Sequence, residues 1–228
     1  MQKLMMTDSA GEFFETPPPP PAKELKQERA VRTRERVLAA AAQAFAAKGY
    51  PAVTILDVAR ASGMTKGAVY FHYENKDALA VAVVDMFHRR LSAVAESVEE
   101  LALPPVSAVA ELLIRTASAF REETVLQAGA RLQVERQLIS AQLPVPYQAY
   151  TDLITGWLSS REQAGPGDLV PPATLAGVLV SAFFGAQHLS WVLNDRADLL
   201  ERTLAIVRTV MPMAESDLRL CPSAPRRP

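Results

Sequence analysis

The 228-residue sequence predicts an all-α protein. Nearly half of its residues, 49%, are apolar but only 7% are aromatic, and such an Ala-, Leu- and Val-rich composition suits packed helices better than sheets. Apolar residues recur at the three- and four-residue spacing of amphipathic helices through most of the chain. No stretch alternates polar and apolar residues for long enough to indicate a strand.

Four regions follow one another along the chain. Residues 1–26 are expected to be a disordered leader, because the five prolines of 17–21 cannot continue a helix and their flanks are polar. This leader has no apolar segment typical of a signal peptide. Residues 27–75 predict a small three-helix domain, residues 76–212 a larger helical body, and residues 213–228 a flexible tail.

The small domain begins with a helix over residues 27–48. A second helix, 55–61, follows Thr54, whose side chain can cap it together with Asp57 at the third helical position. A third helix is expected over residues 66–73. Because only a tight turn joins the two short helices, they must pack at a steep angle, as in a helix-turn-helix.

The residues around this turn meet the steric demands of a helix-turn-helix. Counted from Ile55 as the first position, the fifth is Ala59, which lets the helices approach, and the ninth is Gly63, which can adopt a left-handed conformation. The fourth and fifteenth positions, Val58 and Val69, are apolar and are expected to be buried. These requirements are met together, which predicts that the third helix lies in the major groove of DNA.

Side chains on the third helix and at neighbouring helix N-termini have the chemistry to contact DNA. Lys66 can reach a guanine edge or a phosphate, and Gly67 lets the backbone come close to the duplex. The alternative is a helix-turn-helix used only for packing, but exposed polar side chains on so short a helix have no packing purpose. The candidate DNA contacts are Thr54, Thr65, Lys66, Gly67, Tyr70, His72 and Lys76.

The charge distribution agrees with this assignment. Residues 23–90 contain 12 Lys and Arg against 7 Asp and Glu, whereas residues 91–228 contain 11 against 15. A basic front and an acidic rear fit a protein that meets phosphates at one end only.

The body predicts helices for two tasks, pairing with a second copy and sensing a ligand. The expected helices are 76–101, 106–121, 124–140, 147–163, 172–193 and 196–211, with a turn at Gly165-Pro-Gly167. Helix 172–193 is apolar on more than one face and carries small residues at Gly177 and Gly185, which favours burial on both sides. With the stripe of helix 196–211 it predicts a four-helix interface in a homodimer; the alternative is a core helix of a monomer.

Polar residues that interrupt apolar helix faces are candidates for a small-molecule pocket. For each, the alternative is a buried side chain whose hydrogen bonds are satisfied within the core. The candidate ligand contacts are His88, Gln133, Tyr147, Tyr150, Trp157 and Gln187. Two further residues, His188 and Trp191, are assigned to the dimer interface.

Nothing in the sequence indicates an enzyme. The three histidines are widely spaced, no arrangement resembles a catalytic or metal site, and neither a cofactor nor a metal is expected. The single cysteine, Cys221, allows no disulfide within the chain, which agrees with a reducing cytoplasm. The longest uncharged apolar stretch, about 175–186, is shorter than the ~20 residues that span a bilayer. We therefore expect a cytoplasmic protein with no membrane partner.

The run Thr33-Arg-Glu-Arg-Val-Leu, followed by Phe45, Gly49-Tyr50 and Gly63-Met-Thr-Lys-Gly-Ala-Val-Tyr-Phe-His72-Tyr, resembles the TetR family of one-component repressors. The resemblance implies a homodimer with an N-terminal DNA-binding domain and a helical ligand-binding body. It assigns DNA contacts to the seven candidate positions given above.

A looser resemblance, to the γ-butyrolactone receptor subfamily, covers most of residues 27–211. It lies in Ala128-Gly-Ala-Arg-Leu-Gln-Val-Glu135, Leu143-Pro-Val-Pro-Tyr147, Phe183-Phe-Gly-Ala-Gln-His188 and Asp195-Arg-Ala-Asp-Leu199. It implies a repressor of antibiotic biosynthesis that a diffusible signal releases from DNA, with a lactone, butenolide or alkyl furan-carboxylate as the signal. In receptors of the furan type, the positions of His88, Gln133 and Tyr147 hold the polar head. The subfamily usually has a tryptophan where Tyr150 stands here.

Two alternatives remain within the wider family. One is a regulator of an efflux pump that responds to a drug-like effector, and the other is a pseudo-receptor that responds to antibiotics. A cationic drug favours a pocket with several buried carboxylates, whereas Gln133 with tyrosines favours a small neutral or anionic head.

Overall fold

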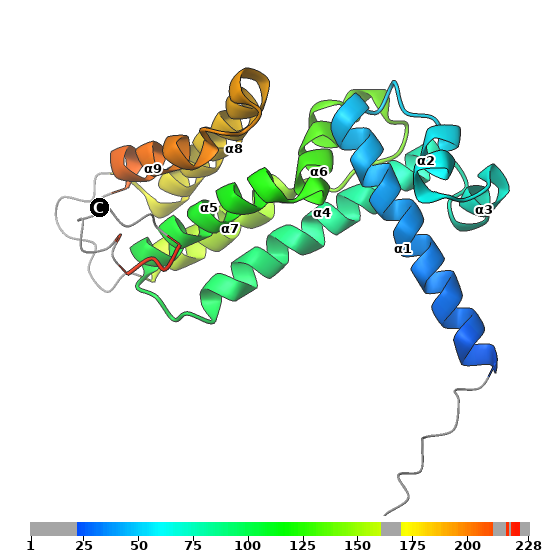
Figure 1. Ribbon diagram of the computed structural model, residues 1–228. Coiled ribbons are helices and arrows are strands. Elements are labelled where there is room, and N and C mark those ends of the chain that lie inside the picture. Colours follow the sequence, from blue (N-terminus) through cyan, green and yellow to red (C-terminus); the bar gives the residue numbers. More distant parts are fainter. Residues whose placement is uncertain (1–21, 161–169, 212–217, 219, 224–228) are drawn as a thin grey trace, which may run out of the picture. The chain divides into compact units, whose positions relative to one another are not determined.

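The computed structural model describes residues 22–160, 170–211, 218 and 220–223. Within these ranges the regular elements are helices and no strand occurs, so the all-α fold class is confirmed (Figure 1). The elements are α1 (Ala22–Lys48), α2 (Ile55–Ser62), α3 (Lys66–His72), α4 (Lys76–Glu99), α5 (Pro105–Glu122), α6 (Thr124–Val134), the 3-10 helix η1 (Arg136–Leu138), α7 (Pro146–Ser159), α8 (Pro172–Asn194) and α9 (Leu199–Val210).

Several helix ends differ from the sequence prediction. Helix α1 begins at Ala22, so a leader that extends to residue 26 is wrong at its end. Helix α6 ends at Val134 rather than near residue 140, because the chain turns through η1 and buries Ile139 in the core. Helix α9 begins at Leu199 rather than at 196, since the two residues after α8 have positive φ angles of 46° and 66°. The turn predicted at residues 165–167 lies outside the described residues.

The chain divides into two compact units, residues 1–35 and 36–228, with α1 beginning in the first and ending in the second. In the first unit the described part of α1 is held by local contacts. The Thr33 hydroxyl donates to the Arg29 carbonyl at 2.8 Å, and Arg32 lies 3.9 Å from Glu28. Most side chains of residues 27–35 are exposed, so this part of α1 is stabilised by contacts within the helix.

One core cluster of the 36–228 unit surrounds α2 and α3. It contains apolar residues of α1, α2, α3 and the first half of α4, and it continues into α6 through Ala128 and Leu132. Ile139 and Leu143, in the segment after α6, belong to the same cluster. The predicted boundary between residues 75 and 76 is therefore not a gap between separate cores.

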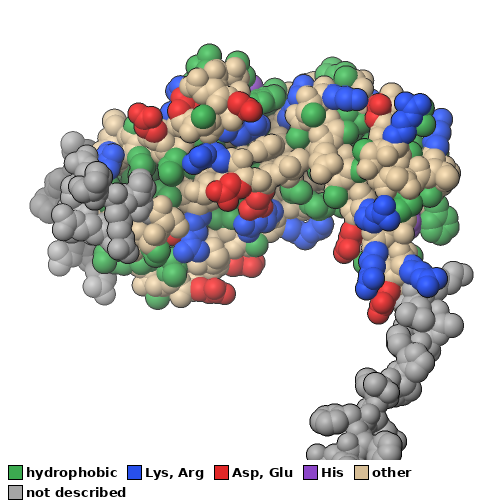
Figure 2. Space-filling view, viewed as in Figure 1, with side chains coloured by type: hydrophobic (Ala, Val, Ile, Leu, Met, Phe, Trp, Pro, Cys, Tyr) green, Lys and Arg blue, Asp and Glu red, His purple; other side chains and the backbone are tan. Residues whose placement is uncertain are grey.

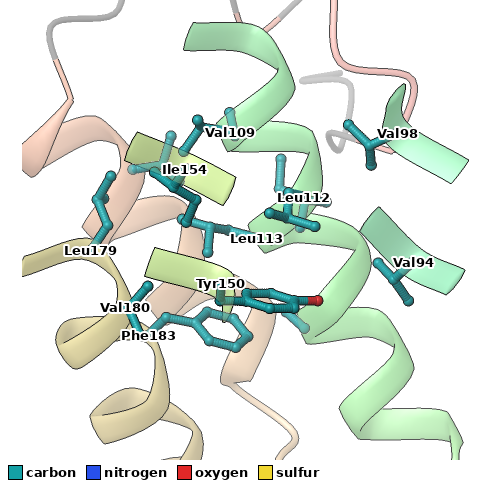
Figure 3. Close-up of a cluster of buried hydrophobic side chains, with 14 of the residues drawn as sticks. Val94, Val98, Val109, Leu112, Leu113, Tyr150, Ile154, Leu179, Val180 and Phe183 are labelled. Carbon is teal, nitrogen blue, oxygen red and sulfur yellow. The ribbon is translucent and has the colours of Figure 1, made fainter. Parts of the chain in front are cut away.

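The second cluster fills the space among the end of α4 and helices α5, α7, α8 and α9 (Figure 3). The described C-terminal residues belong to it, because Leu218 and Cys221 are buried and the Ser223 hydroxyl donates to Glu111 at 2.7 Å. A flexible tail is therefore wrong for residues 218 and 220–223. The remainder of the predicted tail lies outside the described residues.

Helix α8 is long and apolar enough to cross a membrane by length and composition, with a mean hydropathy of 1.4 over its most apolar window. The sequence analysis took the uncharged apolar stretch as about 175–186 and so did not predict that the helix is long enough to cross a membrane. In the structure α8 packs against α7 and α9, and one side of it enters the core. A helix that is apolar on two sides has the composition of a membrane span even when it is a core helix with a second, exposed apolar face.

Helices α4 and α6 approach closely at Gly129. A Cβ atom at this position would lie 2.2 Å from Cγ and 2.4 Å from Cβ of Phe87, whose ring is fully buried. Only glycine leaves room for this ring, so residue 129 sets the distance between the two helices.

We expect Gly129→Ala to lower the free energy of unfolding by about 1–3 kcal/mol, the usual effect of overpacking a core. Gly156→Ala is the matched control, because no atom lies within 4 Å of its added Cβ. That change should instead raise stability by about 0.5–1 kcal/mol, since alanine favours a helix interior. Urea denaturation measures both; similar shifts of the same sign would contradict the close contact.

Candidate DNA-reading helix and small-molecule site

The turn between α2 and α3 has the geometry that its residue types predicted. Gly63 has φ 66° and ψ 29°, and the Met64 N–H donates to the Ala59 carbonyl at 2.9 Å across the turn. Ala59 is 1% exposed, and both Val58 and Val69 are fully buried. The Thr54 hydroxyl accepts the Asp57 N–H, so the predicted cap of α2 is also confirmed. These features hold α3 rigidly against α2.

Helix α3 presents an exposed face made by the predicted residues. Thr65, Lys66, Gly67 and Tyr70 are all exposed. The Thr65 hydroxyl accepts the Ala68 N–H at 3.1 Å, which leaves its hydrogen able to donate to a phosphate. On the face seen in Figure 2, Lys and Arg side chains lie over the part of the 36–228 unit that carries α2 and α3 and also along the rest of the unit.

The sequence reasoning missed Phe71, which is 82% exposed on α3. Its ring makes an edge contact with His72, with 5.1 Å between the ring centroids. The available signal was its place in the helix: Val69 occupies the buried side, so residues 70 and 71 must project outward. An exposed aromatic ring beside Tyr70 adds an apolar surface to the exposed side of α3.

The other predicted DNA contacts are engaged within the protein. The Thr54 hydroxyl donates to Asp57 at 2.7 Å. The Lys76 ammonium donates to the Tyr50 carbonyl at 3.0 Å and lies 4.1 Å from the centre of the Tyr50 ring. Burial, and then a hydrogen bond to Asp77, raise the pKa of Tyr50 to about 12. Lys76 is thus held at the N-terminus of α4, where a phosphate is favoured.

Helix α6 is joined to the end of α1 by polar contacts that the sequence did not indicate. The Arg131 guanidinium donates to the carbonyls of Ala46 and Ala47 at 3.0 and 3.1 Å. Glu135 accepts the Tyr50 N–H at 2.5 Å and pairs with Arg131 at 3.1 Å. We call this set of contacts the α1–α6 clamp. It ties the C-terminal carbonyls of α1, which lack helical partners, to the helix that carries Gln133.

An aromatic cluster joins four helices of the body. Its members are Phe87, Phe120, Tyr147, Tyr150, Phe183 and Phe184. Gly129, which Phe87 contacts, lies one helical turn before Gln133, and Phe183 lies one turn before Gln187. Because residues four apart share a helix face, the two glutamines approach this cluster from α6 and α8.

Three predicted ligand residues around this cluster have buried polar atoms without a partner. The Gln133 side chain donates from Nε2 to the Pro144 carbonyl at 2.6 Å, but its Oε1 accepts nothing, and the residue is 5% exposed. Gln187 Nε2 and His88 Nε2 are likewise buried and unpaired. Leaving a polar atom unpaired in a core costs about 1–3 kcal/mol, so these groups would gain from a ligand with complementary polar atoms.

The remaining three predicted residues have different surroundings. Tyr147 is half-buried and lies edge-on to Phe184, with 4.7 Å between ring centroids, and burial raises the pKa of its hydroxyl. The Tyr150 hydroxyl is 3.2 Å from both the Thr116 hydroxyl and the Leu91 carbonyl.

Figure 3 shows Tyr150 among core side chains, with its oxygen directed toward the side of Val94. Tyr150 is therefore a satisfied core residue, the alternative that the sequence left open. Trp157 borders a cavity of about 180 Å³ near the α4–α5 connection, with Leu103 and Ala108. The structure does not bring Trp157 together with Gln133.

Comparisons with known proteins agree with this geometry. Residues 37–83 match the family model described as bacterial regulatory proteins, TetR family. The A-factor receptor protein of Streptomyces griseus is 29% identical over 188 residues, which are 82% of this chain and 65% of that receptor.

Two solved structures extend the similarity over the body. A protein described in work on the control of antibiotic production by bacterial hormones is 43% identical, with a TM-score of 0.71, over 79% of this chain and 96% of that one. A γ-butyrolactone receptor described as ArpA-like is 25% identical, with a TM-score of 0.62, over 80% of this chain and 99% of that one.

We expect Tyr150→Phe to lower the free energy of unfolding by about 1 kcal/mol at pH 7, because it removes buried hydrogen bonds. Burial raises the pKa of Tyr150 in the folded protein from 10 to about 12. The contribution of the neutral hydroxyl is therefore complete below pH 10 and is lost as the pH rises through 12. The stability difference between wild type and variant should shrink over this interval in urea titrations. Tyr147→Phe is the control. If both changes affect stability equally, Tyr150 is not distinguished from Tyr147 by buried hydrogen bonds.

Proposed function

Because this chain belongs to the TetR family of bacterial regulatory proteins, we propose that it is a ligand-responsive transcriptional repressor. It binds operator DNA as a homodimer and leaves it when a small diffusible signalling molecule binds. The signal is a γ-butyrolactone, a butenolide or an alkyl furan-carboxylate, and the regulated process is antibiotic biosynthesis. The similarity to the A-factor receptor and to the hormone-related structure supports this proposal.

One observation carries the proposal: Gln133, which is buried with an unpaired Oε1, lies on α6, and Arg131 of the same helix donates a hydrogen bond to the end of α1. The two side chains lie two residues apart on α6, one next to the aromatic cluster and the other next to α1. A ligand that donates a hydrogen bond to Gln133 therefore acts on the helix that holds the DNA-reading part of the chain.

DNA recognition rests on residues 27–75, with α3 in the major groove. Lys66 reads a base edge or a phosphate, Tyr70 contacts a phosphate, and Gly67 lets the backbone approach. Phe71 contacts sugar or base methyl groups. Thr54, Thr65, His72 and Lys76 contact phosphates. In a dimer bound to DNA the two α3 helices lie about 34–36 Å apart, one turn of the duplex.

The switch follows from the packing of α6. A ligand held by His88, Gln133, Tyr147 and Gln187 displaces α6 relative to α4 and strains the α1–α6 clamp. The reading helices then leave the spacing that fits DNA. The factor by which operator affinity falls is set by how much more tightly the ligand binds the released state than the DNA-bound state. To move the ratio of released to DNA-binding protein from 1:99 to 99:1, the ligand must bind the released state about 10⁴-fold more tightly.

The exposed face of α8 supports a homodimer. Val178, Leu189, Val192 and Leu193 are 48–63% exposed, and a Cβ atom on Gly185 would meet nothing within 4 Å. These positions form an apolar stripe with a small residue at its centre, which suits close approach of a second α8. On α9, Leu199 and Val207 are buried within the same chain, whereas Leu200, Ile206 and Val210 are partly buried and remain the candidates for contact with a second copy.

A signal receptor fits the body better than an efflux regulator that binds cationic drugs. Among the described residues Glu111 is the fully buried acid, and it pairs with Arg115 at 2.7 Å. Among the described residues, no buried carboxylate without a partner is thus available to a cationic drug. We further propose that the protein is cytoplasmic, is not an enzyme, and works without a metal or cofactor.

We expect Lys66→Gln to weaken operator binding and to reduce the slope of log affinity against log salt by about 1, because one phosphate-directed charge is lost. Fluorescence anisotropy at several salt concentrations, on a duplex selected from random DNA, measures both. Arg208→Gln, an exposed charge on α9, is the control and should change neither. If Lys66→Gln behaves like this control, α3 is not the reading helix.

We expect Gln133→Met to raise the effector concentration needed for operator release about tenfold, the effect of one lost hydrogen bond of ~1.4 kcal/mol. Affinity for the operator without effector should stay unchanged. Titrations with one compound from each signal class measure release, and Gln148→Met, an exposed residue of α7, is the matched control. Release at the wild-type concentration, or no release by any class, would overturn the ligand assignment.

We expect Leu189→Glu to shift the protein from dimer to monomer, because it buries an unpaired charge at the proposed interface. Sedimentation equilibrium measures the mass. Leu101→Glu replaces an exposed leucine at the end of α4 and should leave the dimer intact. A dimer of wild-type stability in Leu189→Glu would show that α8 does not form the interface.

A further inference from the structure

Arg196, in the turn between α8 and α9, is a buried cation without an adequate counter-ion. The residue is 6% exposed, and its Nε has no hydrogen-bond partner. The acid that pairs with it is Asp195, 3.8 Å away, and the Asp195 side chain is 95% exposed. That distance is too long for a hydrogen bond, and burial of an unpaired charge is strongly unfavourable.

The backbone holds Arg196 in place despite local strain. Asp195 and Arg196 both have left-handed φ angles, 46° and 66°. Each such residue costs about 1–3 kcal/mol when it is not glycine. The Arg196 N–H donates to the Ser190 carbonyl at 3.0 Å and fixes the turn at the end of α8. The fold thus maintains a strained turn that directs a guanidinium inward.

Other cationic or polar groups meet Arg196 at the ring of Trp191. The guanidinium carbons of Arg196 and Arg131 lie 5.1 and 5.4 Å from the centre of this ring. His188 lies edge-on to it, with 5.7 Å between centroids, and its buried Nδ1 has no partner. Burial lowers the pKa of Arg196, and the charge of Arg131 lowers it further. We call these four residues the Trp191 cluster.

The neighbouring acids are engaged elsewhere. Asp198 accepts hydrogen bonds from Asn194 at 2.6 Å and Arg202 at 2.7 Å, and another from Ser190. Glu135 is taken by Arg131 and the Tyr50 N–H in the α1–α6 clamp. Within the described part of the chain, Arg131 thus has Glu135 as its partner, whereas Arg196 has only the exposed Asp195 at 3.8 Å, and a ring nitrogen of His188 has no partner.

We propose that the Trp191 cluster binds an oxyanion, the carboxylate or phosphate group of a small metabolite. Arg196 Nε and His188 are the unpaired groups that would hold it, and Arg131 adds charge. Within one subunit the cluster is open on the side of Arg131, whose side chain is 21% exposed; His188 and Trp191, assigned from the sequence to the dimer interface, are half-buried in the single chain. Binding would relieve the repulsion between the two guanidiniums and supply the missing counter-ion.

This site is separate from the one around Gln133. Arg131 and Gln133 are two residues apart on α6, so their side chains point to different sides of the helix. Gln187 and His188 are adjacent on α8 and also diverge. Because Arg131 also donates to the end of α1, an anion in the cluster stabilises the clamp from its other side. The anion would thus bind at a separate site and oppose the release that the signal causes.

The experiment follows the fluorescence of Trp191 in full-length dimeric protein without DNA. Trp157→Phe removes the other tryptophan. Inorganic phosphate and acetate are titrated at constant pH and ionic strength, with chloride as the balancing ion, and the two arms distinguish a phosphate from a carboxylate site. We expect a saturable change in emission with at least one of them, together with a rise in Tm.

Arg196→Gln should weaken this anion response at least tenfold, whereas Arg202→Gln, one turn along α9, should retain it. Gln133→Met should also retain it, so failure of the signal proposal leaves this test intact. If Arg196→Gln does not fold, the anion titrations of Arg196→Lys and of the parent protein still show whether the cluster binds an anion.

Two results overturn the proposal. One is a response to neither anion beyond that to chloride. The other is an unchanged response in Arg196→Gln. If Arg196→Gln instead weakens the dimer in sedimentation experiments while the parent ignores both anions, a carboxylate of the partner subunit fills the role.

Discussion

The contact of Phe87 with Gly129 determines how the body of this protein is assembled. A buried ring on α4 occupies the space that any side chain at residue 129 would need, so α6 lies directly against α4. From this position α6 directs Arg131 toward the end of α1 and Gln133 toward the aromatic cluster. One close packing contact thus sets the relation between the proposed DNA-reading and ligand-sensing parts of the 36–228 unit.

Unsatisfied polar groups distinguish the functional regions of the body from its ordinary core. Thr116 and Tyr150 are buried and hydrogen-bonded, as core polar groups usually are. Gln133, Gln187 and Arg196 are equally buried but each keeps an unpaired atom. Since each such atom opposes folding, a sequence that retains several of them gives up stability for groups that a ligand can pair. The first two suit a signal with polar atoms, and the third suits an anion.

The accuracy of the sequence reasoning depended on how local each interaction is. The turn at Gly63, the cap at Thr54 and the burial of Val69 follow from residues within a few positions of one another, and all three were predicted correctly. The end of α6 was misplaced, because contacts of Glu135 with Tyr50, distant in sequence, accompany the turn into η1. Tyr147, Tyr150 and Trp157 were all predicted as ligand contacts, because the sequence shows which residues a helix carries but not which neighbours they meet in the fold.

By itself the sequence determined the helical fold class, the helix-turn-helix and the set of polar residues on apolar faces, because periodicity, capping and turn sterics act over short stretches of chain. The tertiary structure decided which of those polar residues are satisfied. It showed that Tyr150 is bonded to Thr116 while Gln133 is left with an unpaired oxygen, and that Arg131 joins α6 to α1. Hydrogen-bond partners come from helices far apart in sequence, so only the packed molecule shows whether a buried polar group has a hydrogen-bond partner.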